Sequence, residues 1–284
     1  MIPNSIYNFK KIIYSLSNKC NLKCPTCFRT NMEFIDTSYD IKVLKKEIAK
    51  HIYSDLETIL FSSILEEPFL YKDIFELLKY IRKIEKIPNK HIDIKIETNA
   101  SLGTKEFWKE TGKFCNDNDI TLGFTICGST QELHNHYRRG SKLEKMLDNI
   151  YSAIKYTDNY LIYLLRFKYN NMDINNYKQW PFIKNFKEDK IIITDTNLFN
   201  EKVYHKEEFN DFNSHKEYIK PQPRQCPSLV ENSIQVENGK FYPCTRFQYQ
   251  HKAIENNPES IKRLYEDISK NKYKFCETCT NEWI

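Results

Sequence analysis

The feature that most constrains the fold of this 284-residue chain is a regular alternation of strand and helix patterns between residues 11 and 194. Short runs rich in Ile, Leu and aromatic residues alternate with segments whose apolar residues recur every three or four positions. The predicted strands span residues 11–16, 57–63, 91–98, 120–127, 160–168 and 190–194. The predicted helices span residues 39–53, 70–84, 105–116, 131–156 with a break at Gly140, and 175–186. This alternation predicts a parallel sheet with right-handed crossovers.

The number of strand units predicts how far the sheet closes. Six units are too few for a closed eight-stranded barrel, so we expect an α/β fold, a partial (β/α)6 TIM-like barrel that stays open. Its active site should lie at the carboxyl ends of the strands. We expect this barrel domain over residues 1–197, a connector over 198–225 with a short helix at 206–219, and a small cysteine-rich domain over 226–284.

Composition excludes several classes of partner. The 43 basic and 38 acidic residues are too evenly balanced to favour a nucleic acid partner. The sequence contains no apolar run of about 18 residues, so we expect no transmembrane helix. The first residues, Met1 to Ser5, are not followed by the apolar region of a signal peptide. We therefore expect a cytoplasmic protein without a nucleic acid or membrane partner.

The nine cysteines favour metal binding over disulfides in a sequence of this cytosolic type. Cys115 and Cys127 stand alone, and we interpret them as small core residues on a helix face and at a strand end. The other seven form two groups, Cys20, Cys24 and Cys27 near the start and Cys226, Cys244, Cys276 and Cys279 near the end.

The first group forms a Cys-x3-Cys-x2-Cys motif directly after the first predicted strand. Three thiolates on one short loop can bind three irons of a [4Fe–4S] cluster and leave the fourth iron without a protein ligand. Together with Glu67-Pro68 after the second strand, this motif resembles the radical S-adenosylmethionine (SAM) superfamily. The resemblance implies that SAM chelates the open iron through its amino and carboxylate groups. It also implies that one electron cleaves SAM into methionine and a 5′-deoxyadenosyl radical, which abstracts hydrogen from the substrate.

The same resemblance implies residues that bind SAM. The family's Gly-Gly-Glu-Pro segment corresponds to Leu65-Glu66-Glu67-Pro68, where Glu67 would accept a hydrogen bond from the SAM ammonium. Alternatively, Glu67 caps the helix that follows it. Thr98-Asn99-Ala100 is similar to the family's Thr-Asn-Gly, which would place Asn99 near the SAM carboxylate or ribose.

An arginine of the segment His136–Ser141 would bind the SAM carboxylate, because Arg can hold a carboxylate through two parallel hydrogen bonds. Of the two arginines present, Arg138 is favoured over Arg139. The alternative is a surface pair of arginines before a helix.

The second group of cysteines resembles the twitch domain, a shortened form of the SPASM extension of some radical SAM enzymes. The resemblance implies an auxiliary [4Fe–4S] cluster bound by all four thiolates. The alternative is structural zinc, although zinc ribbons usually offer two Cys-x2-Cys knuckles and this segment has one. Between the first two cysteines, Val236 to Phe241 predicts a hairpin with Asn238-Gly239 as its turn.

These sites predict a radical SAM oxidoreductase or dehydrogenase, because a fully ligated auxiliary cluster can accept an electron from a substrate radical. Such an oxidation needs a proton acceptor, and the candidates at strand ends are Arg166, Tyr163 and Asp195. The first electron would come from a donor such as flavodoxin or ferredoxin.

Two classes of substrate remain open. The short segment before the first strand favours a hydroxylated small molecule such as a sugar or cyclitol, because peptide maturases often carry a longer N-terminal peptide-binding wing. The alternative is a maturase that modifies a peptide or protein side chain. A third hypothesis is a metal-binding scaffold without catalytic activity, which would not cleave SAM.

Overall fold

The computed structural model describes residues 9–25, 27–31, 36–52, 55–62, 66–195, 233–237 and 240–242, together with 259–260, 263 and 266–267. The connector and the four C-terminal cysteines, Cys226, Cys244, Cys276 and Cys279, lie outside these residues.

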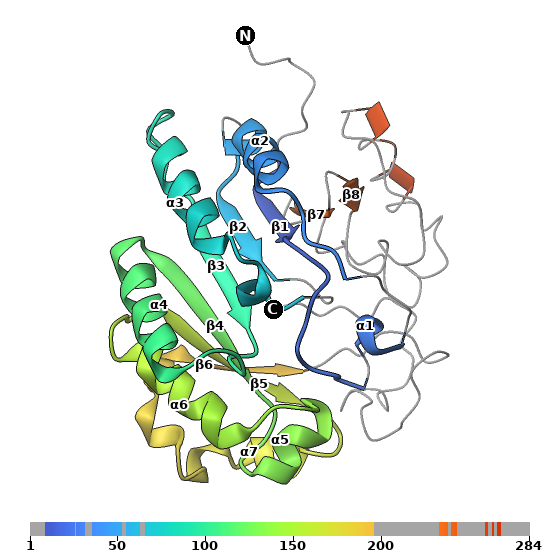
Figure 1. The fold of residues 1–284 in the computed structure, drawn as a ribbon. Coiled ribbons are helices and arrows are strands. Elements are labelled where there is room, and N and C mark those ends of the chain that lie inside the picture. Colours follow the sequence, from blue (N-terminus) through green and yellow to red (C-terminus); the bar gives the residue numbers. More distant parts are fainter. Residues whose placement is uncertain are drawn as a thin grey trace.

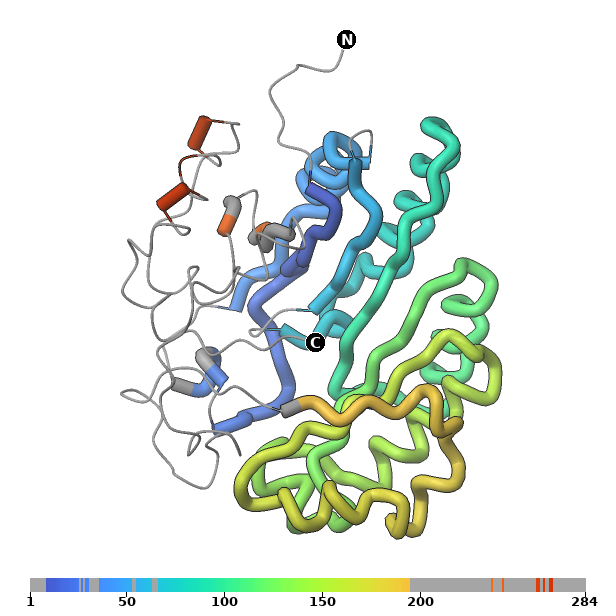
Figure 2. Tube along the Cα trace, turned by 180° about the vertical axis from the view of Figure 1, so that it is seen from behind, coloured from blue at the N-terminus to red at the C-terminus, as the bar shows by residue number. Residues whose placement is uncertain are grey.

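The six predicted strands are present and form one parallel sheet (Figure 1). They are β1 (Lys11–Ser15), β2 (Thr58–Phe61), β3 (Asp93–Thr98), β4 (Ile120–Ile126), β5 (Tyr160–Arg166) and β6 (Ile191–Asp195). Each strand pairs with the next in sequence order, while β6 and β1 do not pair with each other. Figure 2 shows them following one curved surface from blue β1 to yellow β6. The prediction of a partial, open barrel is therefore confirmed.

Helices cover one face of this sheet. The main ones are α2 (Ile41–Ile52), α3 (Ile74–Ile84), α4 (Lys105–Asp117) and α6 (Leu143–Ile154). Their apolar stripes pack on alternate strand residues such as Ile96 and Phe124, which have no exposed surface. The intervening strand residues, including Glu97, Gly123 and Tyr163, face the opposite side because side chains alternate along a strand. We call that opposite side the inner face.

Some predicted helices differ from the structure. The break at Gly140 is confirmed, since this residue has a φ of 95° between α5 (Gln131–Tyr137) and α6. The helix predicted over 70–84 begins later, as α3, after the 3-10 turn η1 (Pro68–Leu70).

The helix predicted over 175–186 is wrong. Its place is taken by α7 (Asn171–Asn175) and the short 3-10 turns η2 (Tyr177–Gln179), η3 (Ile183–Asn185) and η4 (Glu188–Lys190). Pro181 lacks the N–H that a helix interior needs, and the asparagines before it favour turns.

Two further strands extend the sheet beyond β1. Strand β7 (Ser233–Glu237) pairs parallel with β1, and β8 (Lys240–Tyr242) pairs antiparallel with β7. Because Glu237 pairs with Lys240, two residues connect the strands, and the predicted hairpin is confirmed. The position of this hairpin at the β1 edge of the barrel sheet was not predicted.

Among the described residues, no helix combines the length and apolarity needed to cross a membrane.

Candidate functional site

The three N-terminal cysteines lie on the loop that leaves the carboxyl end of β1, the edge where parallel α/β folds bind ligands. Cys24 is buried, whereas Cys20 and Cys27 are partly exposed. A tight turn shapes the motif, because the N–H of Cys27 donates to the carbonyl of Cys24 at 3.1 Å. Helix α1 (Phe28–Asn31), which was not predicted, begins directly after Cys27.

Burial raises the pKa of all three thiols, and that of Cys20 rises to about 11. The N–H of Leu22, which donates to the Cys20 sulfur at 3.5 Å, acts in the opposite direction. Without metal, these thiols therefore stay protonated at neutral pH. Iron binding must displace their protons.

The three thiols match the protein ligands that a [4Fe–4S] cluster with one open iron requires. Among the described residues, no three Cys, His, Asp or Glu side chains converge on one metal position. A [4Fe–4S] cluster does not require such convergence, because each thiolate binds a different iron.

Glu67 connects the cysteine loop to the end of β3. Its N–H donates to the carbonyl of Lys19 at 2.7 Å. Its buried carboxylate accepts hydrogen bonds from Thr98 Oγ1 at 2.6 Å and from the Asn99 N–H at 2.8 Å. Glu67 also caps η1 through a 3.4 Å bond from Phe69, so the predicted capping role and the position at the site coexist.

The preceding residue, Glu66, was missed by the sequence prediction. It stands where the family has glycine, and its carboxylate is buried beside the end of β1. It accepts hydrogen bonds from the Leu16 N–H at 2.9 Å and from the Ser17 N–H at 2.6 Å. Glu66 therefore fixes the start of the cysteine loop with a side chain that glycine does not have.

Asn99 faces the cysteine loop with its amide nitrogen, which lies 3.0 Å from Asn21 Oδ1 and 3.8 Å from Cys20 Sγ. The amide oxygen accepts a 2.8 Å hydrogen bond from the Ser101 N–H. Because one end of the amide accepts and the other donates, its orientation is set by its neighbours.

A buried histidine supports the loop that follows Asn99. His134 Nδ1 accepts from the Cys127 N–H at 3.3 Å, so the ring hydrogen lies on Nε2, 3.1 Å from Ser141 Oγ. Ser141 Oγ lies 2.8 Å from Ser101 Oγ. Burial lowers the pKa of His134 to about 3, which keeps the ring neutral. A lone histidine carries no sequence signal for this role.

Arg138 lies against the cysteine loop, whereas Arg139 is exposed. The Arg138 guanidinium lies beside the thiols of Cys24 and Cys127. Its buried Nε has no hydrogen-bond partner among the described residues. Leaving a buried donor unpaired is costly, so this N–H fits an acceptor that a ligand such as SAM would supply.

Tyr163 lies on the inner face, close to Glu97 of β3. Gly123 of β4 makes room for both, because a Cβ at Gly123 would lie 2.8 Å from Tyr163 Cε2 and 3.1 Å from Glu97 Cγ. Burial, and then the charge of Glu97, raises the pKa of Tyr163 to about 12. Tyr163 is therefore a neutral phenol at physiological pH.

Arg166, the second candidate proton acceptor, is not brought to Tyr163. Alternation along β5 places Arg166 with Ile162 and Leu164, on the helix-covered side, and Arg166 Nη1 donates to Asn175 Oδ1 at 3.0 Å. Asp195 is the last residue of β6 and pairs with Arg166, while its side chain lies outside the described part of the structure.

The two isolated cysteines are fully buried, as predicted. Cys115 belongs to the main core, and Cys127 packs with Phe167.

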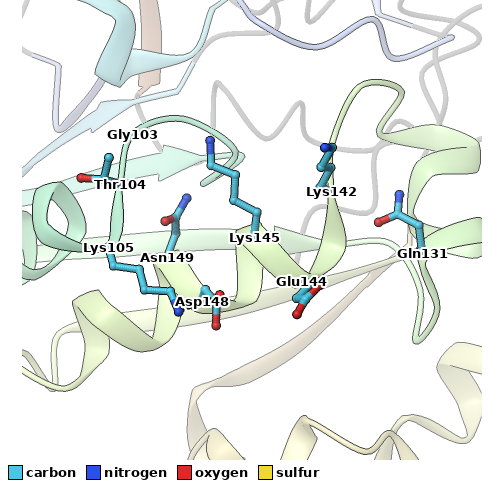
Figure 3. Close-up of a pocket in the computed structure, with 9 residues that line it drawn as sticks. All are labelled: Gly103, Thr104, Lys105, Gln131, Lys142, Glu144, Lys145, Asp148 and Asn149. Atoms are coloured by element: carbon cyan, nitrogen blue, oxygen red, sulfur yellow. Dashed lines mark ion pairs between the residues drawn. The ribbon is translucent and has the colours of Figure 1, made fainter.

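A surface pocket lies away from the cysteines, between the start of α4 and helix α6 (Figure 3). Lys105 and Asp148 form an ion pair of 2.9 Å in it. Asn149 reaches from α6 to the loop after Asn99, where it donates to the carbonyls of Ala100 and Leu102. Through these two hydrogen bonds, Asn149 holds the loop after β3 from the helix-covered side of the sheet.

A family model described as the radical SAM superfamily matches residues 14–180. The matched segment contains the cysteine loop, Glu67, Asn99 and Arg138. Among curated proteins, no relative matches the chain.

Solved structures share the fold at low identity. Native anSMEcpe with bound AdoMet is 18% identical, with a TM-score of 0.67 over 93% of this chain and 82% of that one. Streptococcus suis SuiB bound to precursor peptide SuiA is 16% identical, with a TM-score of 0.58 over 98% and 68%. BtrN in complex with AdoMet and 2-DOIA is 14% identical, with a TM-score of 0.52 over 98% and 95%.

Proposed function

This chain belongs to the radical SAM superfamily, and we propose that it is an oxidoreductase acting on a hydroxylated small molecule such as a sugar or cyclitol. The observation that carries the proposal is the cysteine loop at the carboxyl end of β1, surrounded by Glu67, Asn99 and Arg138. When bound, the [4Fe–4S] cluster and SAM that the family implies supply a radical that removes one hydrogen atom from the substrate.

The chain's own residues bind and orient SAM in this proposal. Glu67 accepts a hydrogen bond from the SAM ammonium while Thr98 and Asn99 hold its carboxylate in place. Arg138 donates its unpartnered Nε to the SAM carboxylate. Asn99 directs its amide nitrogen at the cysteine loop.

A second [4Fe–4S] cluster, bound by the four C-terminal cysteines, would accept an electron from the substrate radical and so make the reaction an oxidation. The docking of β7 on β1 supports this role, because it attaches the C-terminal segment to the strand that precedes the cysteine loop. The first electron would come from a flavodoxin or ferredoxin.

The inner face would receive the substrate. Tyr163 would donate a hydrogen bond to it, because its raised pKa keeps the phenol protonated. Arg166 stays charged and is a poor proton acceptor. Asp195 stays a prediction from the sequence, because its side chain lies outside the described part of the chain.

A peptide or protein side chain is the second candidate substrate. The similarity to SuiB bound to its precursor peptide SuiA supports this alternative, whereas the similarity to BtrN with 2-DOIA supports a small molecule.

Anaerobic turnover with a panel of sugars, cyclitols and peptides tests the proposed reaction. The expected product lacks two hydrogen atoms relative to its substrate, and one 5′-deoxyadenosine forms for each product. The variant Cys276→Ala/Cys279→Ala, checked by circular dichroism, should still cleave SAM and should no longer form this product. A folded double variant that makes product at the normal rate would contradict the role of the auxiliary cluster.

A further inference from the structure

The inner face carries a carboxylate that the SAM site does not use. Glu97 is the second-last residue of β3, two residues before Asn99, and alternation turns its side chain away from the helices. Ser62 Oγ donates to Glu97 Oε2 at 2.6 Å. Within the described part of the chain, that is the one hydrogen bond this carboxylate accepts, and it forms no ion pair there.

A glycine, rather than a larger residue, lies next to Glu97 in the neighbouring strand β4. Its neighbour across the strands is Gly123, which has no side chain to cover it. Beyond Gly123 lies the ring of Tyr163, which is also on the inner face. The phenol of Tyr163, a hydrogen-bond donor, and the carboxylate of Glu97, an acceptor, thus lie on either side of Gly123.

Among the residues that the structure describes, Glu97 has no cationic partner. Lys95 occupies the same face of β3, yet it forms no ion pair with Glu97. The Arg138 guanidinium lies beside Cys24 and Cys127 instead. Partial burial of a carboxylate costs solvation free energy. A charge-assisted hydrogen bond from a cation can offset that cost.

We propose, resting on the function proposed above, that Glu97 binds a positively charged amine of the substrate, with Tyr163 hydrogen-bonded to a neighbouring polar group. The substrate class is therefore an amine-bearing molecule, either an amino sugar or aminocyclitol, or a peptide presenting a lysine. Both sources share the ammonium group that Glu97 recognises.

Matched ligand pairs test this assignment by binding rather than turnover. Titration calorimetry on the anaerobically reconstituted protein with SAM would compare glucosamine with glucose, and a lysine tripeptide with its norleucine analogue. The wild type should bind the amine of one pair about 10- to 100-fold more tightly, the range expected for hydrogen bonds to charged groups. The pair that shows the preference identifies the source of the amine.

Glu97→Gln should abolish this preference and leave the affinity for the neutral ligand within about twofold, since Gln retains the shape and loses the charge. The control Glu110→Gln removes an exposed charge on α4 and should keep the preference. Equal amine preference in wild type and Glu97→Gln, or no preference in either pair, overturns the assignment. Failure of the proposed function is a separate result, namely a wild-type protein that does not cleave SAM.

Discussion

The amide nitrogen of Asn99 lies 3.8 Å from the sulfur of Cys20, so the end of β3 contacts the cysteine loop that follows β1. Hydrogen bonds to cluster sulfurs are one of the means by which proteins set the reduction potential of an iron–sulfur cluster. We therefore expect Asn99 to act on the cluster ligand as well as on SAM.

The substitution Asn99→Asp removes the hydrogen-bond donor of this side chain and keeps an acceptor. Aspartate still accepts the hydrogen bond from Ser101, but it replaces the N–H near Cys20 with a negative charge. The reduction potential of the N-terminal cluster should fall by roughly 50–100 mV, which corresponds to about 1–2 kcal/mol for one electron. A redox titration followed by electron paramagnetic resonance measures it. Asn116→Asp, an exposed position on α4, is the control, and equal potentials in the two variants would refute the contact.

Glu67→Gln should weaken SAM binding by about 1.5–3 kcal/mol, or about 10- to 150-fold in Kd, because a neutral amide replaces a charged acceptor. The bond from Thr98 should persist, which limits the change in structure. Equilibrium binding of SAM to the reconstituted protein gives the Kd. Normal affinity would show that another group binds the SAM ammonium.

The buried carboxyl group of Glu66 should make the free energy of unfolding depend on pH. Burial raises its pKa to about 8 from 4.5, so the folded chain holds this proton more tightly than the unfolded chain. Its contribution is full below about pH 4.5 and is lost as the pH rises to about 8. His51 and His134, whose pKa values burial lowers, act oppositely below about pH 6.5 in wild type and variant alike.

The contribution of Glu66 is measured as the difference in the free energy of unfolding between the wild type and Glu66→Gln. Between pH 5 and pH 8, the free energy of unfolding of the wild type should fall relative to that of the variant, as measured by urea denaturation. A constant difference across this range would mean that Glu66 is already ionised at the lower pH.

Gly112 allows helices α4 and α6 to pack closely. A Cβ there would lie 2.2 Å from the carbonyl oxygen of Ala153, which is backbone and cannot rotate away. Gly112→Ala should therefore destabilise the fold by roughly 2–3 kcal/mol through overpacking. In Gly140→Ala, the nearest side-chain atom would lie 3.7 Å away, so only the strain of its φ of 95° remains. Thermal unfolding should rank Gly112→Ala below Gly140→Ala, and the reverse order would contradict this packing.

Local patterns predicted strands β1 to β5 because each has buried residues at every second position, as Ile94 and Ile96 do in β3. They also predicted the hairpin, since Asn-Gly favours a two-residue turn. The pairing of β7 with β1 could not be predicted in this way, because it joins segments more than two hundred residues apart through backbone hydrogen bonds.

The sequence predicted those residues of the candidate site that belong to a recognisable motif. It did not predict the residues that only the three-dimensional structure brings to the site. Cys20, Glu67 and Arg138 belong to motifs, and the structure brings them to one end of the sheet. Glu66 departs from its motif, and Glu97 looks like an ordinary polar residue of an alternating strand. Sequence spacing does not reveal their hydrogen-bond partners, which are Leu16 for Glu66 and Ser62 for Glu97.

The most direct test of the central claim is the release of 5′-deoxyadenosine from SAM by the anaerobically reconstituted, dithionite-reduced protein. The wild type should release it slowly without substrate, and Cys24→Ala should release none, because one of three iron ligands is lost. Cys115→Ala, which removes a buried core thiol, should retain the release. Release by Cys24→Ala at the wild-type rate, or no release by the wild type, would contradict the assignment of the cysteine loop as the SAM-cleaving site.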